Sequence, residues 1–170
     1  STINGAALAT PVFLSLYAEN DLRLDKYFAE TDEKGFRKNK KAGSNNYLCT
    51  FRVGEIYLTA AEAAARLGEL SQARTRLLEL MRKRYAPEAY EAKSVVVNAM
   101  DKEALVQEIL DERARELAFE GHRWFDLRRS TRPRLEKVLD GTRYVLEEND
   151  ARYTLAIPKE AIEANPGLLN

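Results

Sequence analysis

The chain has 170 residues and carries 27 basic and 27 acidic side chains, so its formal net charge at pH 7 is zero. This balance argues against nucleic acid or an anionic membrane as a partner, and the length allows a real core. A single cysteine, Cys49, and a single histidine, His122, exclude an internal disulfide and a thiolate or histidine metal site, so we expect no metal and no cofactor.

Residues 1–50 read as an irregular, loop-rich entry. The stretch from Pro11 to Tyr17 fits a strand or a short buried helix, and so few residues leave both open. Residues 21–30 are compatible with a short helix. Glycine and asparagine then predict a loop over residues 31–46.

Three aromatic side chains are weak candidates for sugar binding. Phe36 and Tyr47 lie in or beside the predicted loop, and Tyr90 lies further along the chain. An aromatic ring offers an apolar face on which a sugar can stack, with a polar group beside it. The alternative interpretation is a solvated loop that one of these rings anchors to the protein.

A helical core is predicted for residues 51–130. Apolar residues recur at three- and four-residue spacings from Val53 to Leu67, and a second helix follows Gly68, with Ser71 as a candidate N-cap. The two fit a tetratricopeptide helix pair, which needs further helices to cover it. Residues 86–100, with their run of valines, read as a linker.

The central helix starts at Asp101, a predicted N-cap, and should run to Phe119 before Gly121 ends it. Glu112, Glu116 and Glu120 fall four residues apart, so the three carboxylates share one face and repel one another. Two interpretations follow.

In the first, a structural one, arginine side chains neutralise these glutamates and fix the helix against residues 124–129, with Trp124 and Phe125 packed in the core. The available donors are Arg113, Arg115, Arg123, Arg128 and Arg129. In the second, two of the glutamates are the acid and base of a glycosidase.

The C-terminal residues 131–170 are expected to hold a small hairpin and a closing segment. A short helix is predicted over 134–139, ending at Asp140-Gly141. Strands are predicted over 143–147 and 152–157, joined across residues 148–150. A last short helix starts at Pro158 and ends before Asn165-Pro166.

The stretch ERARELAFEGHRWFDLRR, residues 112–129, resembles the C-terminal hallmark of the SusD-like (SusD/RagB) family, the outer-membrane glycan-binding lipoproteins of Bacteroidota. The matching positions are Glu112, Arg113, Glu116, Leu117, Glu120, Gly121, Arg123, Trp124, Asp126, Leu127 and Arg129. A second family segment is similar at Arg52, Glu55, Tyr57, Leu58, Ala61, Glu62 and Ala63.

Two weaker matches flank these segments. Asn20-Asp21-Leu22-Arg23 resembles an upstream N-D-x-R of the family, and Ile157-Pro158 with Asn165-Pro166 resembles its closing segment. Glu160 stands one residue early in that segment, where Ala161 fills the family's acidic position.

The resemblance implies a mostly α fold of tetratricopeptide-like helix pairs with a small β-hairpin near the C-terminus. We expect residues 1–170 to form a single domain, the C-terminal portion of a longer SusD-like protein. The charged motif residues would then be scaffold and not ligand contacts.

The same resemblance implies non-catalytic glycan binding at the bacterial cell surface. The sugar would pass to a SusC-like TonB-dependent transporter for nutrient uptake, and membrane association would rest only on a lipid anchor missing from this chain. Two alternatives stay open: a helical scaffold that contacts the transporter and holds no sugar site in this segment, and the glycosidase.

Overall fold

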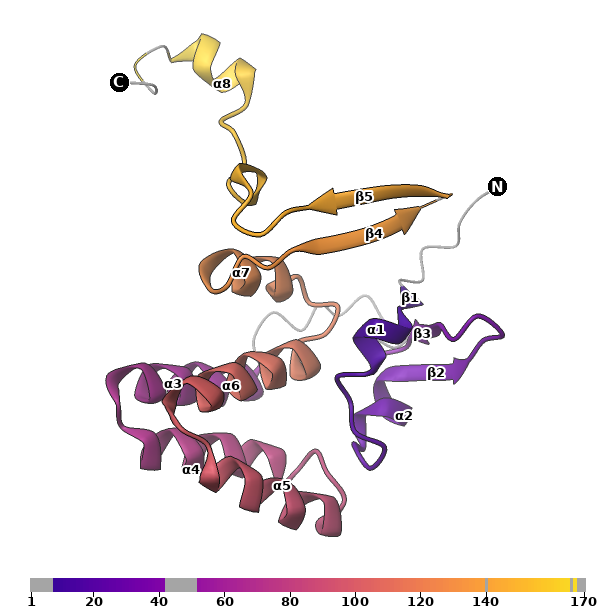
Figure 1. The fold of residues 1–170 in the computed structure, drawn as a ribbon, viewed down its shortest axis with the longest axis vertical. Helices are drawn as coiled ribbons and strands as arrows, with labels where there is room; N and C mark the ends of the chain where they lie inside the picture. Colours follow the sequence, from indigo (N-terminus) through magenta and orange to yellow (C-terminus); the bar gives the residue numbers. More distant parts are fainter. Residues whose placement is uncertain (1–7, 42–51, 140, 166, 168–170) are drawn as a thin grey trace. The chain divides into compact units, whose positions relative to one another are not determined.

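A computed structural model describes residues 8–41, 52–139, 141–165 and 167. The chain divides into two compact units, Ser1–Arg123 and Trp124–Asn170. Helices dominate and a small antiparallel pair of strands lies near the C-terminus, which confirms the predicted fold class (Figure 1). The expectation that residues 1–170 form a single domain stays a prediction.

Four helices form the larger part of the first unit. They are α3 (Val53–Leu67), α4 (Leu70–Met81), α5 (Pro87–Ala99) and α6 (Lys102–Glu116). Helices α3 and α4 form the predicted pair, and α6 packs on α3. Fully buried residues fill the space between them: Leu58, Leu77, Met81, Leu105 and Ile109. Gly68, at φ 86°, ends α3 in the left-handed conformation that glycine tolerates.

Two local predictions in this region are wrong. The linker expected over residues 86–100 is helix α5, which starts with Pro87 at its first position and buries Val97 against the core. Three consecutive valines have a weak helix propensity, but the burial of Val97 outweighs it. Ser71 is not an N-cap, because that position belongs to Glu69.

The first forty residues contain more regular structure than expected. Helices α1 (Pro11–Leu14) and α2 (Arg23–Tyr27) accompany a sheet of order β1-β3-β2, built from Leu8–Ala9, Arg37–Asn39 and Phe28–Thr31. Both pairings are antiparallel. The loop predicted over 31–46 is therefore wrong at β3, which has only three polar residues and no apolar alternation to reveal it.

Helix α6 ends three residues before the predicted Phe119. Its last residue is Glu116, and a turn follows in which Phe119 has φ 63° and Gly121 has φ 84°. Gly121 thus supplies the predicted break, while Phe119 adopts a left-handed conformation that is uncommon for a bulky residue. Helix α7 (His122–Arg129) starts directly after this turn.

The second unit holds the hairpin of β4 (Leu135–Leu139) and β5 (Thr142–Leu146), the 3₁₀ turn η1 (Ala151–Tyr153) and helix α8 (Lys159–Ala164). The predicted hairpin lies one element earlier than expected: the helix over 134–139 is a strand, and the strand over 152–157 is absent. Gly141, with φ 77°, lies between two paired strands and does not end a helix, and Asp-Gly is a strong sequence signal for such a hairpin. Helix α8 follows Pro158 as predicted.

Candidate functional site

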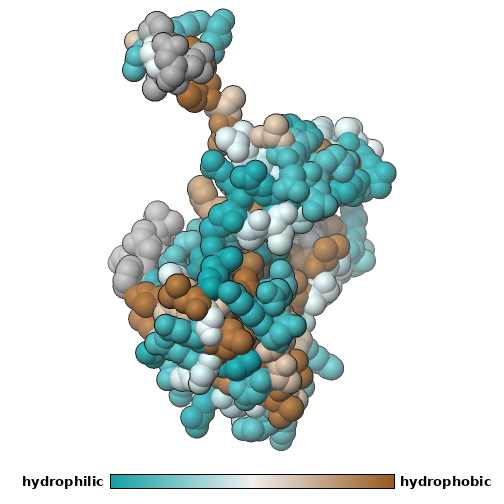
Figure 2. All heavy atoms as spheres, turned by 60° about the vertical axis from the view of Figure 1, so that its left-hand side comes forward, coloured by the Kyte–Doolittle hydropathy of each residue, from teal (hydrophilic) through white to brown (hydrophobic). Residues whose placement is uncertain are grey.

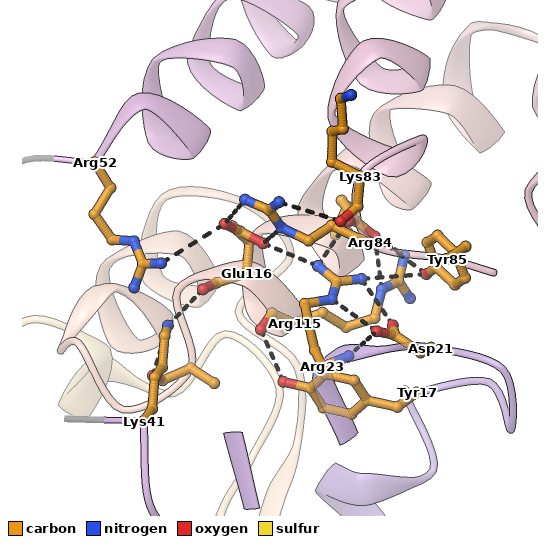
Figure 3. Close-up of polar contacts among 12 residues, drawn as sticks. Tyr17, Asp21, Arg23, Lys41, Arg52, Lys83, Arg84, Tyr85, Arg115 and Glu116 are labelled. Atoms are coloured by element: carbon orange, nitrogen blue, oxygen red, sulfur yellow. Dashed lines mark hydrogen bonds and ion pairs between the residues drawn. The ribbon is translucent and has the colours of Figure 1, made fainter. Parts of the chain in front are cut away.

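The motif glutamates lie on α6 inside a network of charged side chains. Six residues form what we call the buried ion-pair cluster (Figure 3): Asp21, Arg23, Arg84, Glu112, Arg115 and Glu116. Helix α6 supplies Glu112, Arg115 and Glu116. Arg23 is the first residue of α2, and Asp21 lies two residues before it. Arg84 lies three residues after the end of α4. Three carboxylates thus meet three guanidinium groups.

Arg23 is the cation at the centre of this cluster and is only 2% exposed. Its Nη1 donates to Glu112 Oε1 at 2.7 Å and to Glu116 Oε2 at 3.2 Å. Its Nε and Nη2 donate to the two carboxylate oxygens of Asp21 at 2.9 and 2.8 Å. Arg23, which belongs to the segment that resembled an upstream family motif, therefore supplies positive charge to the glutamates of the downstream motif.

Glu116 is clamped by a second arginine. Arg84 donates to both its carboxylate oxygens, through Nε and Nη2, at 2.7 Å each. This bidentate geometry is the strong form of the pair. The other side of the carboxylate lies against Gly54 of α3, where an added Cβ would stand 2.7 Å from Glu116 Oε1. Gly54 is thus the residue that lets α3 approach the clamped side chain.

The outer end of the network is less buried. Arg52 Nη1 donates to Glu120 Oε1 at 2.6 Å, and Lys41 forms an ion pair with the same oxygen. Lys41 also donates to the Glu116 backbone carbonyl at 2.5 Å. Burial lowers the pKa of Lys41 despite these partners. The carbonyls and carboxylates at the end of α6 are a natural place for a cation, because the helix dipole is negative there.

The electrostatics of the cluster do not suit acid catalysis. Burial by itself would raise the pKa of Glu112, but Arg23 and Arg115 outweigh it and hold that pKa below its usual value. Burial would likewise raise the pKa of Glu116, but Arg84 and Arg23 outweigh it and hold that pKa below its usual value. A catalytic acid needs a raised pKa and access to the substrate. Both glutamates are 0% exposed, so neither fits the role that the glycosidase hypothesis requires, and Glu120, the third of these glutamates, is paired with Arg52 and Lys41.

Arginines neutralise Glu112 and Glu116 as the structural interpretation predicts, but two of the three cations are different ones, and the fixing of the helix against residues 124–129 stays a prediction. Of the expected donors, Arg115 takes part, and its Nε donates to Glu112 at 2.8 Å. Arg23 and Arg84, which the prediction omitted, supply the other guanidinium groups. They are 89 and 32 residues away in sequence, and only the N-D-x-R resemblance marked Arg23 beforehand.

The remaining motif residues of the first unit line α3 and its surroundings. Glu62 is buried and accepts from Arg66 Nε at 2.9 Å. Arg113, also buried, donates to Thr59 Oγ1 at 3.2 Å. Glu55 lies 3.6 Å from His122 Nδ1. These contacts are structural in kind, since each charge meets a partner within the protein.

The second unit carries the end of the motif on α7. Trp124 stacks on the buried Tyr153 with ring centroids 5.2 Å apart and planes 9° apart. Asp126 is buried and accepts from Arg129 Nη2 at 2.6 Å. Arg123, at the boundary of the two units, is half-buried.

The three predicted sugar-stacking residues occupy different settings. Tyr90 is half-buried on α5 and packs against the helical core. Phe36 is half-buried beside the Asp32–Phe36 turn, where its backbone N–H donates to Asp32 Oδ1 at 2.8 Å. Tyr47 lies outside the described residues, so the structure does not bring the three together.

Other aromatic side chains are more exposed than Phe36 and Tyr90. Phe125 on α7 is 62% exposed, so the prediction that it packs in the core is wrong; Tyr144 on β5 is 56% exposed, and Phe119 is 41% exposed.

Tyr144 pairs across the hairpin with Lys137, so the two side chains leave the same face of the strand pair. Sequence reasoning placed Tyr144 in the predicted strand over 143–147 but missed its setting, because the partner strand, residues 135–139, was expected to be a helix. Burial in β5 does not alternate, since Thr142, Arg143 and Tyr144 are all exposed.

No cluster of three metal-ligating side chains occurs among the residues that the model describes. Within the same residues, no helix is long and apolar enough to cross a membrane.

Comparison with known proteins gives a consistent result. The model of the SusD family matches residues 9–170. A solved SusD-like carbohydrate binding protein from Bacteroides vulgatus ATCC 8482 is 20% identical, with a TM-score of 0.61. The match covers 94% of this chain and 40% of that chain, so the present chain spans about two fifths of its relative's length. No curated protein matches.

Proposed function

The chain belongs to the SusD family, and we propose that it takes part in non-catalytic capture of an oligosaccharide or polysaccharide at the bacterial cell surface. The captured sugar passes to a SusC-like TonB-dependent transporter for nutrient uptake, and a lipid anchor outside these residues holds the protein at the outer membrane. The family match over residues 9–170 carries this proposal.

The physical basis is aromatic stacking with hydrogen bonds to sugar hydroxyls, and no bond is broken. Phe36 and Tyr47 stay the candidates from the predicted loop, and Tyr144 joins them because its ring is exposed beside Lys137. The motif carboxylates of α6 do not contribute, since Glu112 and Glu116 are buried and held by arginines.

Affinity electrophoresis through gels that contain single polysaccharides tests this proposal. Retardation of the 170-residue chain by one glycan, lost in Tyr144→Ala or in Phe36→Ala with Tyr47→Ala, supports a site in this segment. Thr142→Ala is the matched control, because it lies on the same exposed strand without a ring. A chain that no glycan retards, while a longer version is retarded, places the sugar site elsewhere in the protein.

A specific observation favours a second candidate function for this segment, that of a helical scaffold that contacts a protein. Tyr90 packs on the helical core, and the exposed side of α3 is apolar and without aromatic rings. Such a surface suits a protein partner better than a sugar. Co-purification of the chain with the SusC-like transporter, without retardation by any glycan, is the result expected from this second candidate.

A further inference from the structure

One face of the β4–β5 hairpin leaves an aromatic ring and an ammonium group open to solvent. Side chains alternate between the two faces of a strand pair, and directly paired residues share a face. Tyr144 and its partner Lys137 therefore lie on one face, which we call the Tyr144 face, while Glu136 and Arg143 lie on the other. The ring of Tyr144 is 56% exposed, and Lys137 is exposed as well.

These two groups serve no contact within the described part of the protein. Tyr144 takes part in none of the ring contacts, and Lys137 in none of the ion pairs, that occur among the described residues. In the same unit, by contrast, Trp124 and Tyr153 stack on each other with ring centroids 5.2 Å apart. A ring and a cation that are not used internally are the groups that a ligand can contact.

The charge on the Tyr144 face is positive and is not compensated by the strands. The two strands, of five residues each, include one carboxylate, Glu136, whose side chain leaves the opposite face. There its Oε1 lies 2.5 Å from Arg143 Nε and its Oε2 lies 3.0 Å from Arg134 Nη1. A negative group on a ligand therefore meets the ammonium of Lys137 without competition from a strand carboxylate.

The base of the hairpin is fixed, so the Tyr144 face is formed before a ligand arrives. The Tyr153 hydroxyl donates to the Pro133 carbonyl, two residues before β4, and Arg152 Nη2 donates to the Val145 carbonyl of β5 at 2.9 Å. Trp124 of the family motif stacks on Tyr153 and thereby supports this base. A surface that needs no ordering loses less conformational entropy on binding, which favours affinity.

A ring and a cation on one polar face fit a sugar that carries an acid group. In the space-filling view, the visible surface of the unit that holds the hairpin is mostly hydrophilic (Figure 2). The ring offers the sugar an apolar face, and an ammonium on a flexible stem offers a point charge to a carboxylate or sulfate. We propose that the Tyr144 face binds an acidic glycan, whose sugar ring stacks on Tyr144 and whose carboxylate or sulfate pairs with Lys137. This inference rests on the proposed function, because it names the class of glycan that is captured.

Affinity electrophoresis with matched polysaccharides tests for the acid group. The pairs are polygalacturonate with its methyl ester and dextran sulfate with dextran, and the members of each pair share a backbone and differ in charge. We expect the acidic member of at least one pair to retard the 170-residue chain more strongly than the neutral member. The net charge of the chain is zero, so unspecific attraction to a polyanion is weak.

Three substitutions separate the ammonium, the ring and the overall charge. Lys137→Gln should weaken binding of the acidic member about two- to five-fold, the size of an exposed ion pair, and leave binding of the neutral member unchanged. Tyr144→Ala should weaken binding of every member that retards the parent chain, by about three- to ten-fold. Lys83→Gln removes an equal charge at an exposed position after α4 and should change neither. All three positions are exposed, so the thermal midpoints should equal that of the parent chain.

Each remaining outcome overturns the inference. Retardation by the neutral member that equals or exceeds that by the acidic one removes the acid group and leaves glycan capture standing. An acidic preference that survives Lys137→Gln, or retardation that Tyr144→Ala leaves unchanged, assigns the contact to other residues. A chain that no glycan retards has no glycan site on its hairpin, and retardation of a longer version then decides glycan capture separately.

Discussion

Arg23 is the cation on which the buried ion-pair cluster depends most, and Arg23→Met should destabilise the chain strongly. The guanidinium is 2% exposed and donates to Asp21, Glu112 and Glu116. Methionine keeps most of the length of the side chain and removes every one of these hydrogen bonds. Three buried carboxylates then share the two remaining guanidinium groups, those of Arg84 and Arg115.

The size of the effect follows from the burial of the partners. Removing one member of a buried ion pair costs about 3–5 kcal/mol, because the other charge stays in a low-dielectric site. Glu112 keeps Arg115 and Glu116 keeps Arg84, so we expect the lower part of that range, about 3–4 kcal/mol. At about 2–4 °C per kcal/mol for a chain of this size, the midpoint should fall by about 6–16 °C.

Urea unfolding followed by circular dichroism at pH 7 measures this loss by linear extrapolation. The control is Arg76→Met, which breaks an exposed pair with Glu79 at 3.2 Å and should cost less than about 1 kcal/mol. The deficit of Arg23→Met should shrink at pH 4, because the unpaired carboxylates can then take up protons. A loss below 1 kcal/mol at pH 7, or an equal loss at both pH values, would refute the electrostatic reasoning.

Three further predictions concern the same interior. The pKa values of Glu112 and Glu116 are lowered in the folded state, so the stability that these two groups provide is present above about pH 4.5. As the pH falls below this value, that stability is lost by up to about 1.4 kcal/mol per pH unit for each group. Unfolding free energies measured from pH 7 to pH 3 check this sign. Gly54→Ala should destabilise by up to about 2 kcal/mol in urea, since overpacking against the clamped Glu116 exceeds the gain in helix propensity; a stabilised variant would mean that Glu116 moves aside. Tyr90→Ala should lower the unfolding free energy by about 1–2 kcal/mol and leave any glycan retardation intact, because this half-buried ring packs on the core; loss of retardation at unchanged stability would assign it to the sugar.

The long helices could be predicted because their signal is local. Apolar residues at three- and four-residue spacings located α3 correctly, and the aspartate at position 101 caps α6 as expected, accepting from the Ala104 N–H at 2.9 Å. Both features depend on side chains within one or two turns of each other. The structural interpretation of the motif glutamates also followed from local spacing, since three carboxylates on one face require cations.

The identity of those cations could not be predicted from local pattern. Arg23 reaches Glu112 across 89 residues, and Arg84 reaches Glu116 across 32. Nothing in the neighbourhood of either arginine reports such a contact, because it arises only when α2 and the end of α4 pack on α6. Gly54 is a related case: its small size matters because of Glu116, a residue far along the chain.

The sheet and the hairpin were mispredicted for a different reason. Strand β3 has three polar residues, Arg37–Asn39, and its pairing to β1 and β2 comes from neighbours rather than from its own alternation. At Asp140-Gly141 the same dipeptide fits the end of a helix or a tight hairpin, and the cross-strand pairing of Leu135 with Leu146 decides between them. Tyr144 lies in a strand that was predicted, but the partner of that strand was expected to be a helix, so the setting of its ring was missed.

The buried carboxylates already accept hydrogen bonds from arginines, and this bears on where a sugar would bind under the proposed function. Glu116 accepts from Arg84 on both oxygens and from Arg23 on one, and Glu112 accepts from Arg23 and Arg115. A sugar hydroxyl would have to displace a charge-assisted bond in a site without exposure, which is unfavourable. Substitutions in the cluster should therefore act on stability, and under the proposed function the glycan would contact side chains that face solvent, such as the ring of Tyr144.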